Sequence, residues 1–164
     1  MAKSPTCASH ARIGCGGTLS TRCRFRAEGD GATWPCYARQ AGGNGVHAIR
    51  GATSVAANTR EAILTAGRAL LEQMVARNDL AIGDVVAIWL TLTPDLNQAF
   101  PAEAARQLGW ESVPLLCMQE IPVPGAEPRV LRALMLVQSA AAPAAVRHVY
   151  QGGARRLRPD LSEE

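Results

Sequence analysis

The sequence lacks an apolar run of about eighteen residues, the length at which a helix can begin to span a bilayer. Its first residues also lack the apolar core of a secretory signal peptide. We therefore expect no membrane partner and a cytoplasmic location. An internal repeat of about twenty residues or more is missing as well. With 48% hydrophobic residues in 164, the chain is long enough to bury one globular core.

The five cysteines lack the spacing of a zinc site or of a disulfide framework. No CxxC pair occurs, the number of cysteines is odd, and four of them lie in a Gly/Ser-rich stretch before residue 45: Cys7, Cys15, Cys23 and Cys36. A phosphate-binding glycine loop is also missing, because Gly14-x-Gly16-Gly17 has no strand before it. We therefore predict no metal site.

Surplus positive charge is confined to the beginning of the chain. Residues 1–44 carry six basic and two acidic groups, whereas the remaining 120 residues carry eleven arginines and twelve acidic groups. A nearly neutral body predicts no nucleic-acid partner. Residues 1–45 show neither helical nor strand periodicity, so we expect a disordered or artefactual extension there and one folded domain over residues 46–164.

The periodicity of residues 46–164 predicts several strands and one long helix. In order, we expect a strand Val46–Arg50 running into Gly51, a helix capped by Asn58 with Glu61 three residues later and ending near Asn78, a buried strand Val85–Leu92, a short helix from Pro101 stopped by Gly109, strands Val113–Cys117 and Arg129–Val137, and a C-terminal hairpin of Ala145–Tyr150 with Ala154–Leu157. Gly51 is expected where backbone passes close to a neighbour.

Arg132 is the most informative single residue. Both alternating faces of its predicted strand are apolar, so its guanidinium would be buried and must find a partner. Two interpretations remain open on these residues alone: an ion pair with Glu120, or the binding of an anionic ligand.

Cys117 could be a nucleophile with His148 as its base, but a lone cysteine on an apolar strand is more often a small core residue. A third orienting group cannot be identified. Arg50 at a strand end, Phe100, and Tyr150 have equally ordinary interpretations as solvated or packed residues.

Several motifs together resemble the AroH class of chorismate mutases across residues 46–162. In order, they are HAIRGATSV, LTPDLNQAFPAEAARQLGW, VPLLCMQE, the Arg132 strand, VRHVY and LRPDLS. The resemblance implies an α+β fold, with a mixed sheet and one long helix in each subunit, assembled as a homotrimeric pseudo-α/β-barrel with active sites between subunits. It implies the Claisen rearrangement of chorismate to prephenate, for phenylalanine and tyrosine biosynthesis, without metal or cofactor.

The resemblance also implies residue roles. Arg132 would reach the substrate's ether oxygen and a carboxylate, and Arg50 and Tyr150 would bind carboxylate. Glu120 and the Cys117 thiol would take the ring hydroxyl, so that Arg132, Glu120, Cys117 and Arg50 form the catalytic set. The remaining substrate contacts are expected from the Leu116–Glu120 backbone, including Met118 and Gln119, from the wall residues Phe100 and Ala102, and from Arg106 and Arg158 near the mouth.

Glu103 departs from the family pattern, which often has lysine there, and we expect it to reverse a local charge near a dianionic substrate. Two alternatives belong to other functional classes. One is a non-catalytic trimeric ligand-binding or regulatory protein on the same scaffold, which would not need a donor for an ether oxygen. The other is a Cys/His hydrolase, which lacks an identifiable triad.

Overall fold

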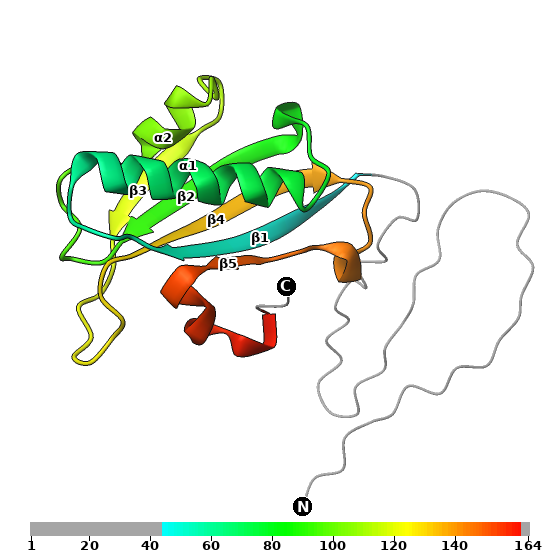
Figure 1. Ribbon diagram of the computed structural model, residues 1–164. Helices are drawn as coiled ribbons and strands as arrows, with labels where there is room; N and C mark the ends of the chain where they lie inside the picture. Colours follow the sequence, from blue (N-terminus) through cyan, green and yellow to red (C-terminus); the bar gives the residue numbers. More distant parts are fainter. Residues whose placement is uncertain (1–43, 162–164) are drawn as a thin grey trace, which may run out of the picture. The chain divides into compact units, whose positions relative to one another are not determined.

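Alternating apolar residues along the chain build a five-stranded mixed sheet with two helices on one face (Figure 1). The computed structural model describes residues 44–161. Its elements are β1 (Gly45–Ser54), α1 (Arg60–Ala76), η1 (Ile82–Asp84), β2 (Val85–Leu92), α2 (Ala102–Gln107), β3 (Leu115–Gln119), β4 (Val130–Ser139), η2 (Pro143–Ala145), β5 (Val149–Gln151), η3 (Gly152–Leu157) and η4 (Pro159–Leu161). This mixed sheet confirms the predicted α+β class.

The strand order is β3-β2-β4-β1-β5, so β4 lies at the centre of the sheet. β4 runs antiparallel to both of its neighbours, β1 and β2. Each edge strand runs parallel to its neighbour: β3 along β2, and β5 along β1. The central strand therefore carries Arg132 into the middle of the sheet.

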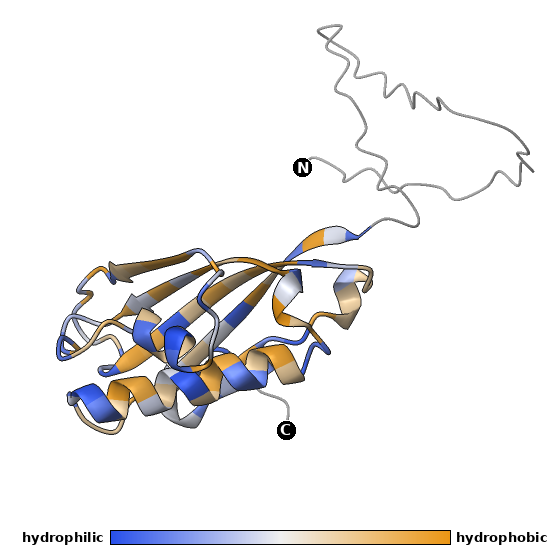
Figure 2. Ribbon diagram, turned by 90° about the horizontal axis from the view of Figure 1, so that it is seen from above, coloured by the Kyte–Doolittle hydropathy of each residue, from blue (hydrophilic) through white to orange (hydrophobic). Residues whose placement is uncertain are grey.

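Helix α1 is 17 residues long and packs its apolar side on the sheet. Figure 2 shows apolar and polar residues alternating around it. The predicted cap at Asn58 is wrong: Thr59 is the N-cap, and its Oγ1 accepts the backbone N–H of Ala62 at 3.2 Å. The Asn58 side chain is instead engaged by Asn97, through two hydrogen bonds of 3.0 Å.

Gly51 lies where β1 passes directly beneath α1. A Cβ atom at this position would overlap the thioether of Met74 and crowd Leu70, which is 3.2 Å away. Met74 and Leu70 are both fully buried. The expectation of a close backbone approach at Gly51 is thus confirmed, and the close approach explains why the residue has no side chain.

The strands β2 and β4 bury only one face within this chain, which corrects the prediction that both faces of each are buried. On β4, Leu131, Ala133 and Met135 lie against the helices and are buried, whereas Leu134 is 38% exposed. The reason is topological, because both helices pack on the same side of the sheet (Figure 1). We call the other side the open face.

The predicted C-terminal hairpin is also wrong. β5 pairs in parallel with β1, and the chain then enters the 3₁₀ helix η3 instead of a returning strand. Gly152 takes a positive φ of 55° at this turn, and the N–H of Gly153 donates to Ser54 Oγ at 2.9 Å. The last residue of β1 therefore holds this turn in place through a hydrogen bond.

Other element limits differ modestly from those predicted. β1 is ten residues long because it pairs with β4 over its full length. β3 begins later than predicted and extends to Gln119, and β4 extends to Ser139. Gly109, with φ of 78°, does follow the end of α2.

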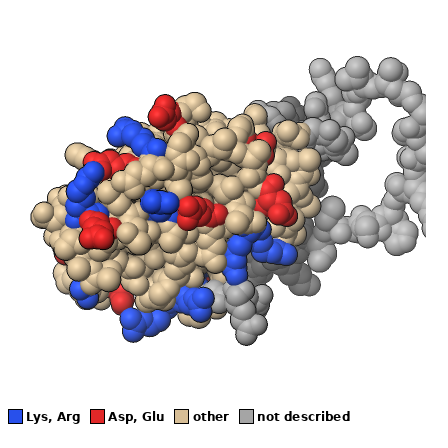
Figure 3. Space-filling model, turned by 45° about the horizontal axis from the view of Figure 1, so that its top comes forward, with Lys and Arg blue, Asp and Glu red and all other residues tan. Residues whose placement is uncertain are grey.

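The face that carries α1 and α2 has the basic and acidic side chains of the described residues interspersed (Figure 3). None of the helices within residues 44–161 is long and apolar enough to cross a membrane. The expected extension over residues 1–45 lies almost wholly outside the described residues.

Candidate active site

One row of paired residues crosses the whole open face of the sheet. Met118 on β3 pairs with Thr91 on β2, Thr91 with Arg132 on β4, Arg132 with Ala52 on β1, and Ala52 with Tyr150 on β5. Residues opposite one another on neighbouring strands share a face. Within this row, Arg132 therefore lies between Thr91 on one side and Ala52 and Tyr150 on the other.

A hollow of about 690 Å³ lies over this row, and we call it the first hollow. Five of the residues predicted for substrate binding line it: Arg50, Met118, Arg132, Tyr150 and Arg158. Its other lining residues are Gly51, Ala52, Trp89, Thr91, Ala133, Leu134 and Leu157. Three arginines thus meet over a mostly apolar floor, an arrangement suited to a small anionic ligand.

Glu120 is anchored at the edge of this hollow by its backbone and by both carboxylate oxygens. Its N–H continues the β2–β3 pairing by donating to Leu92 O at 2.9 Å. Arg132 donates from Nη1 to Oε2, and Thr91 donates from Oγ1 to Oε1 at 2.5 Å. The Glu120 side chain is 15% exposed. A well-held carboxylate therefore lies next to the central arginine.

The structure contains one of the two partners considered for Arg132, the ion pair with Glu120. Its side chain is nevertheless 37% exposed, so it is not enclosed as its apolar strand predicted. Burial lowers the pKa of Arg132, and Tyr150 opposes this effect; an arginine pKa is ordinarily so high that the guanidinium stays charged. A guanidinium has five N–H donors, so the pair with Glu120 leaves donors for a ligand.

Arg158 is held at the first hollow by Asp160. The two make a two-point contact, with Nε to Oδ1 at 2.9 Å and Nη2 to Oδ2 at 2.6 Å. This contact raises the pKa of Arg158 and lowers that of Asp160. Arg158 is therefore a fixed cation even though its segment consists of short 3₁₀ turns.

His148 fixes the backbone of Arg50, since its Nδ1 accepts the Arg50 N–H at 3.1 Å. Burial lowers the pKa of His148, and the positive charges of Arg50 and Arg158 lower it further. The neutral ring is the form that can accept this hydrogen bond.

We expect the protein to lose stability as the pH falls below about 6.5, the ordinary pKa of histidine. Because the pKa of His148 is lower in the folded chain, the unfolded chain binds more protons between the two values. The stability that depends on neutral His148 is complete above that range and is lost as the pH falls through it. Melting temperatures at several pH values should show a smaller acid loss for His148→Gln, whose amide oxygen can still accept. Parallel pH profiles for the two proteins would contradict this expectation.

A second hollow, of about 460 Å³, lies between the end of β3 and the segment leading into α2. It is lined by the other predicted pocket residues Phe100, Cys117 and Gln119, together with Met118, which lines both hollows. Phe100 is 71% exposed. Within one chain, eight of the predicted site residues are therefore divided between two hollows, whereas Glu120 lines neither.

Within one chain, the geometry gives no support to a Cys117–His148 pair. Cys117 is on β3 and packs against the core on the helix side, whereas His148 directly precedes β5. β3 and β5 are opposite edges of the five-stranded sheet. At about 4.8 Å per strand, they lie roughly 19 Å apart. The described part of the chain thus brings no histidine base to this thiol.

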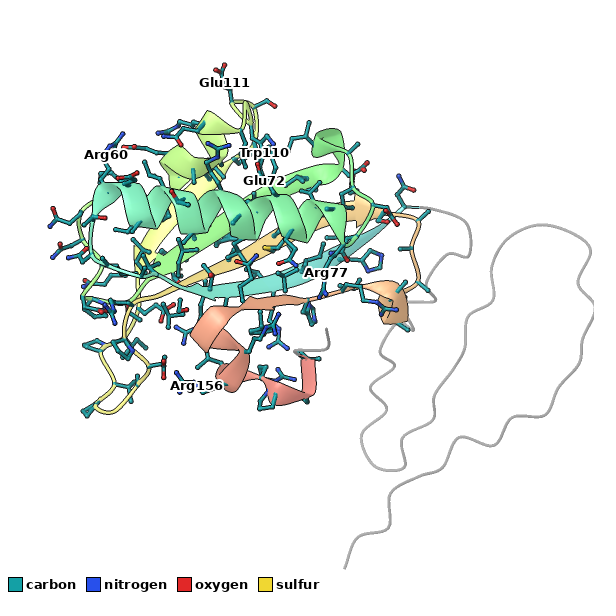
Figure 4. All side chains as sticks on the ribbon, in the orientation of Figure 1. Arg60, Glu72, Arg77, Trp110, Glu111 and Arg156 are labelled. Atoms are coloured by element: carbon teal, nitrogen blue, oxygen red, sulfur yellow. The ribbon has the colours of Figure 1, made fainter. Side chains whose placement is uncertain are left out.

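Glu103, expected to reverse a local charge, has a partner of opposite charge in the structure. Arg60 at the start of α1 (Figure 4) reaches Glu103 on α2, with 2.5 Å between Nη1 and Oε2. Both residues line the second hollow. The opposite charges therefore offset each other at its rim.

Three other predicted residues have less direct positions. Ala102 is buried at the start of α2, where it packs in the core. Arg106 is exposed on the same helix and lines neither hollow. Leu116 points from β3 on the open face and is 52% exposed.

Sequence reasoning missed Trp89, Thr91, Leu134 and Leu157 in the first hollow and Arg60 in the second. A usable signal existed for Thr91, because it is a polar residue inside the apolar run Val85–Leu92. Period-two alternation places Trp89 and Thr91 on the same face. Arg60 had no such signal, since an exposed arginine in the first turn of a helix is unremarkable.

Comparisons with known proteins agree with this geometry. The sequence profile described as "Chorismate mutase type I" matches residues 46–161. The chain is 50% identical over 117 residues to "Chorismate mutase AroH" of Thermus thermophilus, covering 71% of this chain and 96% of that protein. It is 44% identical over 118 residues to "Chorismate mutase AroH" of Bacillus subtilis, covering 71% and 93% respectively.

The solved structure of a chorismate mutase from Clostridium thermocellum superposes with a TM-score of 0.66 at 43% identity. The match covers 67% of this chain and 98% of that one. Profile, sequence and fold agree, and the chain belongs to the type I chorismate mutase family.

Proposed function

We propose that the chain rearranges chorismate to prephenate in the first hollow, as an isomerase of aromatic amino acid biosynthesis. The observation that carries this proposal is the convergence of Arg50, Arg132, Tyr150 and Arg158 on one hollow, beside the ion-paired Glu120. Chorismate carries two carboxylates and a ring hydroxyl, so it matches three cations and one acceptor. Family membership supports the same reaction.

The reaction breaks the ether C–O bond and forms a C–C bond within one molecule, so no group leaves and no electron acceptor is needed. The protein can accelerate it in two ways. It can hold the enolpyruvyl side chain over the ring, and it can stabilise the negative charge that gathers on the ether oxygen. Arg132 supplies that stabilisation, because it is central, charged and has free donors.

The other groups bind and orient the substrate. Arg50 and Tyr150 bind carboxylate from one side of the row, and Arg158 adds a cation held in place by Asp160. Glu120 accepts the ring hydroxyl with the lone pairs that Arg132 and Thr91 leave free.

The enzyme works as a homotrimer whose sites lie between subunits. Two observations support this assembly: the open face exposes Leu116, Met118 and Leu134, and the predicted site residues are divided between two hollows. Exposed apolar area of this kind marks an interface. In the trimer, the three sheets face inwards as a pseudo-α/β-barrel, and Phe100 and Cys117 of one subunit complete the first hollow of the next.

A cytoplasmic location fits a biosynthetic enzyme of this kind. A non-catalytic binder on the same scaffold is not favoured, because binding alone would not require a central arginine placed to meet an ether oxygen.

The function is tested by incubating the purified full-length protein with chorismate. Chorismate absorbance should fall, prephenate should accumulate, and an oxabicyclic analogue of the transition state should inhibit competitively. A rate equal to that of chorismate alone in buffer would exclude the proposed function.

A further inference from the structure

Thr91 is the one described side chain besides Arg132 that donates a hydrogen bond to the Glu120 carboxylate. It pairs with Arg132 across β2 and β4 and with Met118 across β2 and β3, so it lies on the open face and lines the first hollow. Its neighbours along that face of β2 and β4, Trp89 and Leu134, are apolar. The Glu120 carboxylate is the hydrogen-bond partner of the Thr91 hydroxyl.

The hydrogen bonds divide the two oxygens of Glu120 between two donors. Oε2 accepts from Arg132 Nη1, and Oε1 accepts from Thr91 Oγ1. Arginine and carboxylate groups frequently form a fork with two parallel hydrogen bonds. Here the contact is made at one point, and the other oxygen accepts the Thr91 hydroxyl.

We propose that Thr91 is a positioning residue of the rearrangement, which holds Glu120 so that it does not close onto Arg132 as a two-point pair. This inference rests on the proposed function. A fork would occupy a second N–H of the guanidinium that must stabilise the ether oxygen. With Thr91 in place, Arg132 keeps those donors, and Glu120 keeps a fixed direction toward the ring hydroxyl.

The test compares Thr91→Val with Thr91→Ser in the full-length protein. Valine keeps the shape and removes the donor, whereas serine keeps the donor and removes a methyl group. Thr91→Val should lower kcat about tenfold, equivalent to about 1.4 kcal/mol in the barrier, with a smaller change in KM. Thr91→Ser should stay within about threefold of wild type. Melting temperature and oligomeric state are measured alongside, and Thr91→Ala replaces the valine variant if that one does not fold.

A double-mutant cycle with Glu120→Ala separates positioning from a general structural effect. If Thr91 acts through Glu120, replacing Thr91 by valine should change kcat by less than about twofold once Glu120 is absent. Wild-type kcat in folded Thr91→Val, or an undiminished tenfold loss in the Glu120→Ala background, would overturn the inference. An inactive wild type in the same assay would instead refute the proposed function, and this inference with it.

Discussion

Replacing Arg132 by alanine is expected to lower kcat by roughly 10²- to 10³-fold, the loss of about 2.7 to 4 kcal/mol that follows removal of one donor to a developing oxyanion. Arg132 is central in the first hollow, carries free N–H donors and is held by Glu120. Because its proposed contact with the ether oxygen strengthens as that bond breaks, the effect should fall mainly on kcat. Steady-state kinetics with chorismate measure it directly.

Two further variants test whether the loss of kcat is specific to the guanidinium of Arg132. Arg132→Lys keeps the positive charge but not the planar set of donors, so it should recover only part of the lost rate. Arg68→Ala removes an exposed arginine on α1 whose only charged partner among residues 44–161 is Glu72, and it should leave kcat within about twofold. Near-normal turnover by Arg132→Ala would contradict the assigned role.

Placing a charge on the open face is expected to prevent assembly and, with it, catalysis. Leu116→Glu adds a carboxylate to an exposed apolar position of β3, where we propose that a neighbouring sheet packs. Burying it without a partner costs several kcal/mol, so the chains should separate at micromolar concentration and activity should fall more than tenfold. Light scattering after size-exclusion chromatography measures the mass.

The matched control for this variant is Ile82→Glu. Ile82 is also an exposed apolar residue, but it lies in η1, outside the sheet. It should stay trimeric and active. A trimeric, fully active Leu116→Glu protein would show that the open face is not the interface.

Residue patterns predicted those parts of the fold that depend on local periodicity. The apolar run Val85–Leu92 forms β2 with the predicted limits, and the small residue Gly51 marks the close approach of α1. The pairing of Arg132 with Glu120 was one of two alternatives that a charge in an apolar strand allowed. Each of these features follows from the alternation of residues along one strand or from a contact between segments that are close in the sequence.

Features set by packing between distant segments could not be predicted in this way. β5 resembled half of a hairpin, but its partner is β1, about a hundred residues earlier. The exposure of the open face could not be predicted from the sequence. Apolar residues on both sides of a strand indicate that both sides are buried, but they do not say whether the same chain buries them. The proposed role of Thr91 depends on its hydrogen bond to Glu120, which follows the neighbouring strand β3 and lies 29 residues away in the sequence.

A crystal structure of the full-length protein with an oxabicyclic transition-state analogue tests the central claim most directly. The analogue should occupy the first hollow, with its ether oxygen within hydrogen-bond distance of Arg132, its hydroxyl on Glu120, and a neighbouring subunit closing the site. Binding in the second hollow alone, or an ether oxygen that Arg132 does not reach, would contradict the account.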